Sequence, residues 1–470
     1  MPQPLFLADA GMADFCLRRP LGHSISDKNS ESLQQFIVWA FNSEDPSIVR
    51  LGILCVSVPI QQLSTEDHEH ILHRLPHPPG VLFQEYFTQV DSLIVNSSEY
   101  SSKIKGIEVI LMSAKTLMNL GLIKKAWVLY HRAISYCQLL GVHRPQRLFE
   151  RETEKEIRQR NLFWVSICGT EVYLSLLLGL PYASDCRTIP ISFYGDPGST
   201  SMFSHHLLRL SVHVIDRNQM GLSLSSELAG QMQLEIESFA RAMGPDFWDC
   251  EAALNKDNIT KADYFECVTS QMWYHQLRVS LHMPLMIQSV EDHALEPHRL
   301  SCLESSRDLL KIYRIMRSNK SSAFNMVKII DNQAFVCAAL LLGVLGYGTS
   351  TSVDQSMQHA QDKDLVDATM HILRQAAGTS NNNVASQALQ GLETLSLLPR
   401  MNNHLANSNE ASQCATPFIK IVVPYAGVIT ISAGEFLKEQ KHSQQSPPQP
   451  IMNPPPVFTL SHDIFQSFQD

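Results

Sequence analysis

The sequence contains no Cys-x-x-Cys pair, although it has ten cysteines. They occur singly, most of them within apolar stretches, at positions 16, 55, 137, 168, 186, 250, 267, 302, 337 and 414. Closely spaced cysteine pairs are typical of structural zinc sites, and regularly spaced cysteines of disulfide-rich secreted domains. The pattern therefore predicts reduced thiols in the core of an intracellular protein and no metal ligands.

The sequence also lacks an apolar run long enough to cross a bilayer. Its longest apolar stretch, residues 334–345, is much shorter than the roughly 20 residues that a spanning helix needs. The N-terminus has no basic leader, and Asp9 and Asp14 interrupt its apolar residues, so no signal peptide is predicted. We expect a protein that is not secreted and has no membrane partner.

An excess of positive charge is absent as well. The chain has 37 Lys and Arg against 46 Asp and Glu, a net charge of -9. A surface that neutralises phosphates needs clustered basic residues. The modest basic groupings stand beside acidic or apolar residues, at Arg18, Arg19, Arg144, Arg147 and Arg151. No DNA-binding residues are predicted in this chain.

Catalytic constellations are missing from the sequence. The segment 22–26 begins like the Gly-x-Ser-x-Gly elbow of hydrolases but lacks the closing glycine. The segment 195–200 is rich in turn residues and has no lysine to hold a phosphate. We predict no catalytic residues and no cofactor.

Three histidines, His68, His70 and His73, are the only group that invites a metal interpretation. The zinc-protease pattern needs a second histidine four positions after the first, and Leu72 stands there. Prolines follow closely, so we interpret the group as the solvated end of a helix or a loop.

Helical periodicity dominates the sequence from residue 36 to residue 398. Apolar residues recur at spacings of three and four, and glycine or proline marks the ends of these stretches. With 44% apolar residues in 470, the chain can bury a large core. The fold class predicted is all-α, a multi-helical domain.

Two adjacent helices are the clearest elements of this pattern. Residues 106–120 place apolar side chains on one stripe, and residues 124–140 do the same, with Trp127 assigned to the inner face. Gly121 and Gly141 follow them as stop signals. We predict that the two helices pack as a helical hairpin.

A third helix is predicted from about Glu154 to Leu178. Its first half is charged and its second half is almost continuously apolar, so the second half should be buried on most sides. Gly179 and Pro181 end it. Further amphipathic helices are predicted at 203–219, 264–286, 301–316, 334–345, 363–377 and 384–398.

The character of the sequence changes after Leu398. Pro399 is expected to stop the last helix, and residues 402–413 form a polar linker. Residues 418–431 are rich in β-branched side chains around Pro424 and Gly427, which predicts a small β-hairpin. The Gln/Pro/Ser-rich residues that follow are typical of disorder.

The last segment, from Val457 to Asp470, alternates large apolar residues with acids and amides. Its anchors are Leu460, Ile464, Phe465 and Phe468. Such a segment either folds into the hydrophobic groove of a partner or docks as a terminal helix on its own core, and the sequence favours neither.

Two blocks of residues resemble a known family. The first is Gly106-Ile107-Glu108-Val109-Ile110-Leu111, followed by Lys125-Ala126-Trp127 and by Gly141-Val142-His143-Arg144. The second is Arg160-Asn161-Leu162-Phe163-Trp164, then Tyr173-Leu174-Ser175-Leu176-Leu177-Leu178-Gly179-Leu180-Pro181. Together they resemble the fungal-specific transcription factor domain, the middle homology region that follows six-cysteine, two-zinc DNA-binding clusters. Weaker matches, among them Leu281-His282-Met283-Pro284-Leu285, extend the resemblance over residues 35 to 432.

The sequence departs from the family pattern in two places. Relatives carry an Asp-Arg pair before the Tyr-Leu-Ser-Leu run, where this chain has Glu171-Val172, so a salt bridge expected there should be missing or rerouted. The six-cysteine cluster is not found, since only Cys16 precedes Cys55. Zinc is therefore expected only with an additional N-terminal cluster.

The resemblance implies a nuclear transcriptional regulator, commonly of a pathway or a secondary-metabolite gene cluster. The expected organisation is a disordered segment 1–34, a helical regulatory domain 35–400, a linker and hairpin 401–441, and a disordered tail 442–470 that contacts the transcription machinery or a co-activator. It also allows a homo- or heterodimer with a related factor.

Three hypotheses follow. The chain is a factor separated from its zinc cluster, or a cluster-free co-regulator that reaches promoter DNA only through a relative, or an enzyme on a helical scaffold. The last is the weakest, because the sequence offers no convergent titratable groups other than the three histidines.

Overall fold

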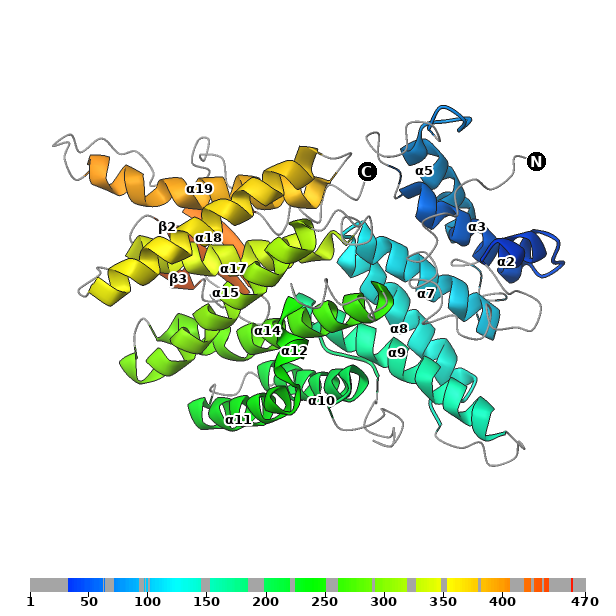
Figure 1. The fold of residues 1–470 in the computed structure, drawn as a ribbon, viewed down its shortest axis with the longest axis horizontal. Helices are drawn as coiled ribbons and strands as arrows, with labels where there is room; N and C mark the ends of the chain where they lie inside the picture. Colours follow the sequence, from blue (N-terminus) through cyan, green and yellow to red (C-terminus); the bar gives the residue numbers. More distant parts are fainter. Residues whose placement is uncertain are drawn as a thin grey trace, which may run out of the picture. The chain divides into compact units, whose positions relative to one another are not determined.

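The fold is described from a computed structural model of the chain (Figure 1). The described residues are 33–61, 63, 72–92, 97, 99, 102–144, 153–184, 198–219, 225–250, 261–289, 292–318, 327–347, 353–378, 382–405, 418–423, 427–432, 435–438 and 458–459. They are almost entirely helical, and the fold class is all-α, as the periodicity predicts.

The chain divides into two compact units. The first comprises Met1–Asp216, Gln231–Tyr274 and Asn319–Val327. The second comprises Arg217–Gly230, His275–Ser318 and Lys328–Asp470.

The first unit begins with three helices, α2 (Leu33–Phe41), α3 (Pro46–Gln61) and α5 (Pro79–Val90). They share a buried cluster with α7 (Ile104–Asn119), in which Phe36, Leu54, Val90 and Met112 are almost inaccessible to solvent. The predicted start of the helical domain, residue 35, lies within α2, and the residues before Leu33 lie outside the described residues.

The predicted helical hairpin is confirmed. α7 packs against α8 (Ile123–Leu139), with Gly121 between them at a φ of 79°. Only glycine adopts this left-handed conformation without strain, which explains why the first helix stops there. The buried face of α8 holds most of the residues predicted for it, namely Ala126, Tyr130, Ala133, Ile134 and Cys137.

The long helix α9 (Glu154–Leu178) also matches the prediction. Thr153 caps its N-terminus through a reciprocal pair of hydrogen bonds with Glu156. Glu156–Leu178 is long and apolar enough to cross a membrane, but the core helix of a soluble protein can have the same length and composition. Trp164, Cys168 and Val172 are buried against the rest of the first unit, as in a core helix.

Gly179 ends α9 with a φ of 68°, and this conformation leads to a prediction. Gly179→Ala should lower the free energy of unfolding by about 1–2 kcal/mol, because an L side chain in this region contacts the following carbonyl. Gly169→Ala is the matched control, since a Cβ at mid-helix Gly169 meets no atom within 4 Å. It should raise stability by about 0.5–1 kcal/mol. Equal changes in urea-unfolding midpoints for the two variants would contradict the cap assignment.

Helices α10 (Thr200–Gln219), α11 (Ser226–Ala242) and α14 (Lys261–Gln288) contribute residues to both units. The short helix α12 (Pro245–Trp248) belongs to the first. The sequence analysis missed α11, because Gly230 and the polar residues around it weaken its apolar stripe.

The second unit is built on α15 (Glu296–Ser318), α17 (Ile329–Tyr347), α18 (Val353–Gly378) and α19 (Asn383–Leu405). A short 3-10 turn, η5 (His293–Leu295), leads into α15. α17 packs against α15, α18 and α19. Its nearly continuous apolar sequence, with Phe335, Cys337 and Leu341 buried, suits this central position.

Two predicted boundaries in this unit are wrong. α18 begins at Val353 rather than near residue 363. α19 continues through Pro399 to Leu405, so the predicted helix stop at Pro399 is wrong. Proline removes one helical hydrogen bond but keeps a helical φ, and Pro284 likewise stands inside α14.

Four strands follow, β1 (Phe418–Val423), β2 (Gly427–Ser432), β3 (Glu435–Lys438) and β4 (Phe458–Thr459), in the order β3-β2-β1-β4. β1 and β2 are antiparallel, with Phe418 opposite Ser432. Residues 424–426 lie outside the described residues, so the hairpin turn stays a prediction. The other residues of the segments predicted to be disordered, 1–32, 442–457 and 460–470, also lie outside the described residues.

Candidate functional site

The residues that carry the family resemblance gather around the junction of α8 and α9 in the first unit. Gly141 follows α8 with a φ of 70°, which turns the chain so that Val142, His143 and Arg144 run back toward α9. The backbone N–H of Val142 donates to the carbonyl of Cys137, which closes the helix end. The Gly141-Val142-His143-Arg144 motif therefore forms the C-terminal end of a helix.

Arg160 of α9 holds this terminus in place. It is buried, and its Nη1 donates to the backbone carbonyls of Val142, at 3.4 Å, and Arg144. The ring of His143 lies edge-on to buried Trp164, with centroids 6.1 Å apart. Burial, and then the charge of Arg144, lower the pKa of His143. The charged half of α9 thus supplies a cation that caps α8, a role its alternating charges did not reveal.

Glu171 is the polar centre of the same junction. Its carboxylate is fully buried in α9 and accepts hydrogen bonds from the hydroxyls of Ser175 (3.1 Å) and Ser184 (2.8 Å) and from the N–H of Ala183 (3.0 Å). His131 of α8 places Nε2 2.9 Å from Oε1, a contact that is an ion pair only when the imidazole is protonated. The acid beside the Tyr-Leu-Ser-Leu run therefore contacts a residue of another helix.

Trp127 joins this network but is not the core residue predicted. Its side chain is half-buried, its ring lies 3.8 Å from that of His131, and its Nε1 donates to Ser175 Oγ at 2.8 Å. An indole that needs a polar partner sits at the edge of a core rather than at its centre, which explains the difference. Ser175 in turn donates to the carbonyl of Pro181 at 3.3 Å.

Tyr173, the remaining residue of the second block, turns away from this network. Its ring meets Trp273 of α14 edge-on, with centroids 5.3 Å apart. Trp273 donates to Ser211 of α10 at 3.0 Å. The family residues therefore tie α9 to its neighbours on two faces. None of them forms a constellation suited to catalysis.

A second buried ionic centre lies in the second unit, and sequence analysis missed it. Asp331 of α17 is fully buried and accepts from Tyr313 (2.9 Å), from Asn382 (2.9 Å) and from two nitrogens of Arg317 (2.6 and 3.1 Å). Burial, followed by the charge of Asp331, raises the pKa of Tyr313. The available signal was a single acidic residue in the first turn of an otherwise apolar helix.

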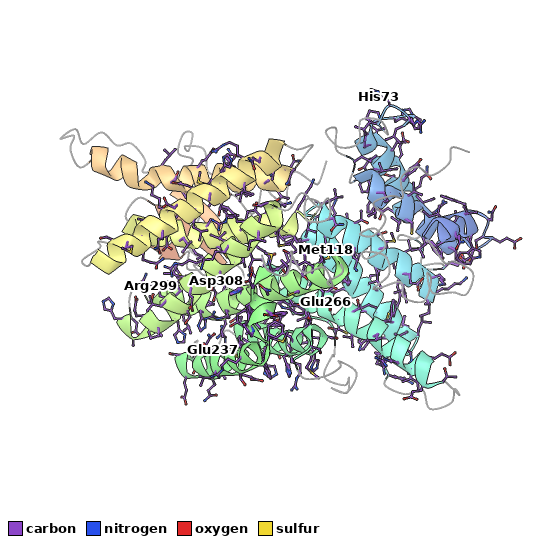
Figure 2. The ribbon with its side chains drawn as sticks, in the orientation of Figure 1. His73, Met118, Glu237, Glu266, Arg299 and Asp308 are labelled. Carbon is purple, nitrogen blue, oxygen red and sulfur yellow. The ribbon has the colours of Figure 1, made fainter. Side chains whose placement is uncertain are left out.

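Two other groups of candidate residues are placed in part. His73 is described, exposed, and lies in the loop before α5 (Figure 2), whereas His68 and His70 lie outside the described residues. Within the described ranges no three His, Cys, Asp or Glu side chains converge on one point. The tail anchors Leu460, Ile464, Phe465 and Phe468 also lie outside the described residues.

Comparison with known proteins gives the family context. No protein-family model matches the chain. It is 21% identical over 416 residues to a dehydrocurvularin biosynthesis regulator of Alternaria cinerariae, aligning 84% of this chain with 54% of that protein. It is 24% identical over 403 residues to transcription factor sdnS of Sordaria araneosa, aligning 82% of this chain with 51% of that protein. The chain resembles fungal transcriptional regulators.

A third relative, transcription factor eupR of Phoma sp, is 24% identical over 253 residues, which are 52% of this chain and 54% of that protein. The chain thus spans about half the length of the curated relatives it matches.

Proposed function

We propose that this chain is the helical regulatory part of a fungal transcriptional regulator that acts in the nucleus and controls biosynthetic genes. The observation that carries the proposal is the similarity to named transcription factors and biosynthesis regulators over more than four fifths of the chain. We also propose that the helical part of the chain is a fungal-specific transcription factor domain.

The character of the interior supports a regulatory rather than a catalytic role. The buried carboxylates of Glu171 and Asp331 accept hydrogen bonds from side chains and backbone groups of the fold itself. A catalytic carboxylate keeps a lone pair directed at substrate. These two groups instead fix the relative positions of α8 and α9, and of α15, α17 and α19.

The proposal assigns DNA contact to a segment or partner other than the described helices. Mapping the 5′ end of the native transcript tests this. A basic segment with six suitably spaced cysteines, in frame and upstream of Met1, is the expected result. A transcript that begins at Met1 would contradict the upstream segment and assign DNA contact to a related factor bound by the helical units.

Deletion of the gene tests the function itself. Transcripts of a set of biosynthetic genes should fall several-fold, and complementation with the full gene should restore them. A transcriptome unchanged apart from the deleted gene would contradict the proposal.

The tail gives a separate prediction. Residues 442–470 fused to a foreign DNA-binding domain should activate a reporter, and Phe465→Ala with Phe468→Ala should reduce its output several-fold, since large apolar anchors dominate such interfaces. Gln466→Ala with Ser467→Ala is the matched control. Equal output from the two double variants, at equal expression on an immunoblot, would remove the activation role from the tail.

A further inference from the structure

Arg217, near the end of α10, is a buried cation that forms no ion pair with the described residues. Its side chain is only 5% exposed. Nη2 donates to the carbonyl of Leu281 at 2.8 Å, and Nε and Nη2 donate to Asn218 Oδ1 at 3.0 and 2.8 Å. Its Nη1 has no partner, and no carboxylate within the described ranges pairs with it. The adjacent acid in the sequence, Asp216, accepts from the hydroxyl of Tyr182.

Asn218 adds a second donor that lacks an acceptor. Its Oδ1 faces the guanidinium, so the orientation of the amide is fixed by its hydrogen bonds. Its Nδ2 is buried and has no partner. Buried donors are almost always satisfied in folded proteins, so two neighbouring exceptions need an explanation.

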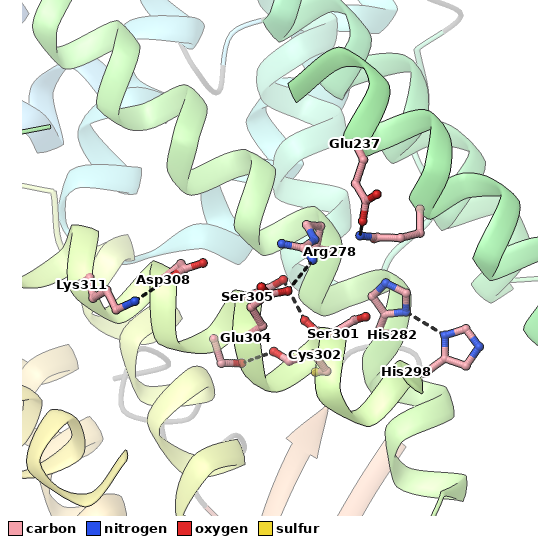
Figure 3. Close-up of polar contacts among 12 residues, drawn as sticks. Glu237, Arg278, His282, His298, Ser301, Cys302, Glu304, Ser305, Asp308 and Lys311 are labelled. Atoms are coloured by element: carbon pink, nitrogen blue, oxygen red, sulfur yellow. Dashed lines mark hydrogen bonds and ion pairs between the residues drawn. The ribbon is translucent and has the colours of Figure 1, made fainter. Parts of the chain in front are cut away.

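Two histidines of the same unit lie close to Arg217. His282 of α14, in the Leu-His-Met-Pro-Leu segment, and His298 of α15 place their Nδ1 atoms 3.0 Å apart (Figure 3). His298 Nε2 lies 2.7 Å from the hydroxyl of Ser226, the first residue of α11. Burial is the largest cause that lowers the pKa of each histidine, and the charge of Arg217 lowers both further.

The charged groups that act on His282 and His298 are all cationic. The groups that act on His282 are His298, Arg278 and Arg217, and Arg217 is the charged group that acts on His298. Arg278 has its own partner, the largely exposed Glu304, at 3.0 Å (Figure 3). Burial lowers the pKa of Arg217 to about 10, so the guanidinium stays charged at neutral pH.

The start of α11 adds to the positive potential. The first N–H groups of a helix have no acceptor within it, and the helix dipole places partial positive charge there. Ser225 Oγ accepts from one of them, the N–H of Leu228. Residues 225–228 of this turn are all exposed, and Glu227 is the acid among them. A buried, unpaired charge is costly, and the natural complement of these donors is a small anion with several acceptor oxygens.

We propose that Arg217 and Asn218, in the second unit beside the exposed start of α11, bind a small oxyanion, a carboxylate or phosphate group. The guanidinium supplies charge and the N–H groups of Nη1, and Nδ2 of Asn218 supplies a second donor. The bound anion favours the protonated form of the histidine pair, so binding takes up a proton. This inference is independent of the proposed function.

The test measures the melting temperature of the full chain at constant ionic strength while chloride is replaced by inorganic phosphate or by acetate. The wild type should show a saturable rise of about 5 °C at anion concentrations near one hundred times the dissociation constant. The two anions separate a phosphate ligand from a carboxylate ligand, since the better fit saturates at lower concentration.

Arg217→Met keeps most of the side-chain volume and should abolish the rise. Arg314→Met, at an exposed arginine of α15, is the matched control and should retain it. Salts that act by exclusion from the surface stabilise all three proteins alike and without saturation. Equal rises in the wild type and Arg217→Met, or no saturable rise in the wild type, would overturn the proposal.

A second measurement needs only the wild type and so does not depend on whether the variant folds. Calorimetric titration with the better anion at pH 6.5, in two buffers of different ionisation enthalpy, should give heats that differ because protons are taken up on binding. Heats that are equal in the two buffers would contradict a role for the histidine pair, and absence of saturable heat would overturn the site.

Discussion

Asp331→Ala should lower the free energy of unfolding by roughly 3–5 kcal/mol, the cost of leaving a buried ion without its partner. The substitution takes its carboxylate partner from the guanidinium of Arg317, which is 6% exposed, and removes the acceptor of Tyr313 and Asn382. Three helices lose their common polar contact at once, because these partners belong to α15 and to the start of α19. Urea unfolding of the full chain, followed by circular dichroism, measures the loss.

The control is Asp308→Ala in α15. Asp308 accepts from Lys311 at 2.8 Å, but this pair is solvent-exposed, so its loss should cost no more than about 0.5 kcal/mol. A loss for Asp331→Ala no larger than that for Asp308→Ala would show that the buried network is not formed.

A second substitution separates the stranded charge from the other losses. Adding Arg317→Met to Asp331→Ala removes the uncompensated cation while keeping apolar volume against Tyr313, so the double variant should recover part of the stability. If the two changes are additive and both destabilise, the guanidinium and the carboxylate do not interact as described.

The sequence predicted the helices that local interactions determine. It missed the features that depend on contacts between residues far apart in the chain. The bounds of α7, α8 and α9 were predicted to within two residues, because the apolar spacing and the glycine after the C-terminal end of each helix are local signals. α11 was missed and α18 was shortened because their apolar stripes are interrupted by polar residues, and packing against other helices decides their extent.

The polar centres were beyond local signals. Glu171 meets His131 forty residues away, and Asp331 meets Asn382 fifty-one residues away, through helices whose packing the periodicity does not specify. The sequence showed that an expected Asp-Arg pair was replaced, but not where the replacing carboxylate would find its partners. Trp127 was assigned to the core because it falls on the apolar stripe, although its indole N–H required an edge position beside Ser175.

The second large effect is expected from pH. The pKa values of three buried histidines lie far below the usual value, at about 4 for His205, about 4 for His275 and about 3 for His282. Burial is the largest cause for each of them. The chain should therefore lose stability as the pH falls from 7 to 5, in a buffer free of multivalent anions.

The groups that face each histidine explain why the charged form is disfavoured. Beside burial, His206 and Arg209 lower the pKa of His205. His275 faces Arg278 and Lys311, which lower its pKa, and Asp308, which raises it without restoring the usual value.

The sign and size of the effect follow from proton linkage. In the unfolded chain a histidine takes up a proton near pH 6.5, whereas these folded-state pKa values are near 3 to 4. The stability that the neutral side chains provide is complete above the unfolded value and is lost as the pH falls toward the folded value. Each histidine should cost about 2 kcal/mol between pH 7 and pH 5, about 6 kcal/mol for the three.

A matched pair of variants tests the assignment. His275→Gln cannot take up a proton, so its stability should fall about one third less than that of the wild type between pH 7 and pH 5, whatever its stability at pH 7. His213→Gln, at an exposed histidine of α10, should follow the wild-type profile. Parallel profiles for His275→Gln and the wild type would show that His275 is solvated. Because the prediction concerns the slope with pH, it holds even where the glutamine packs less well than the imidazole.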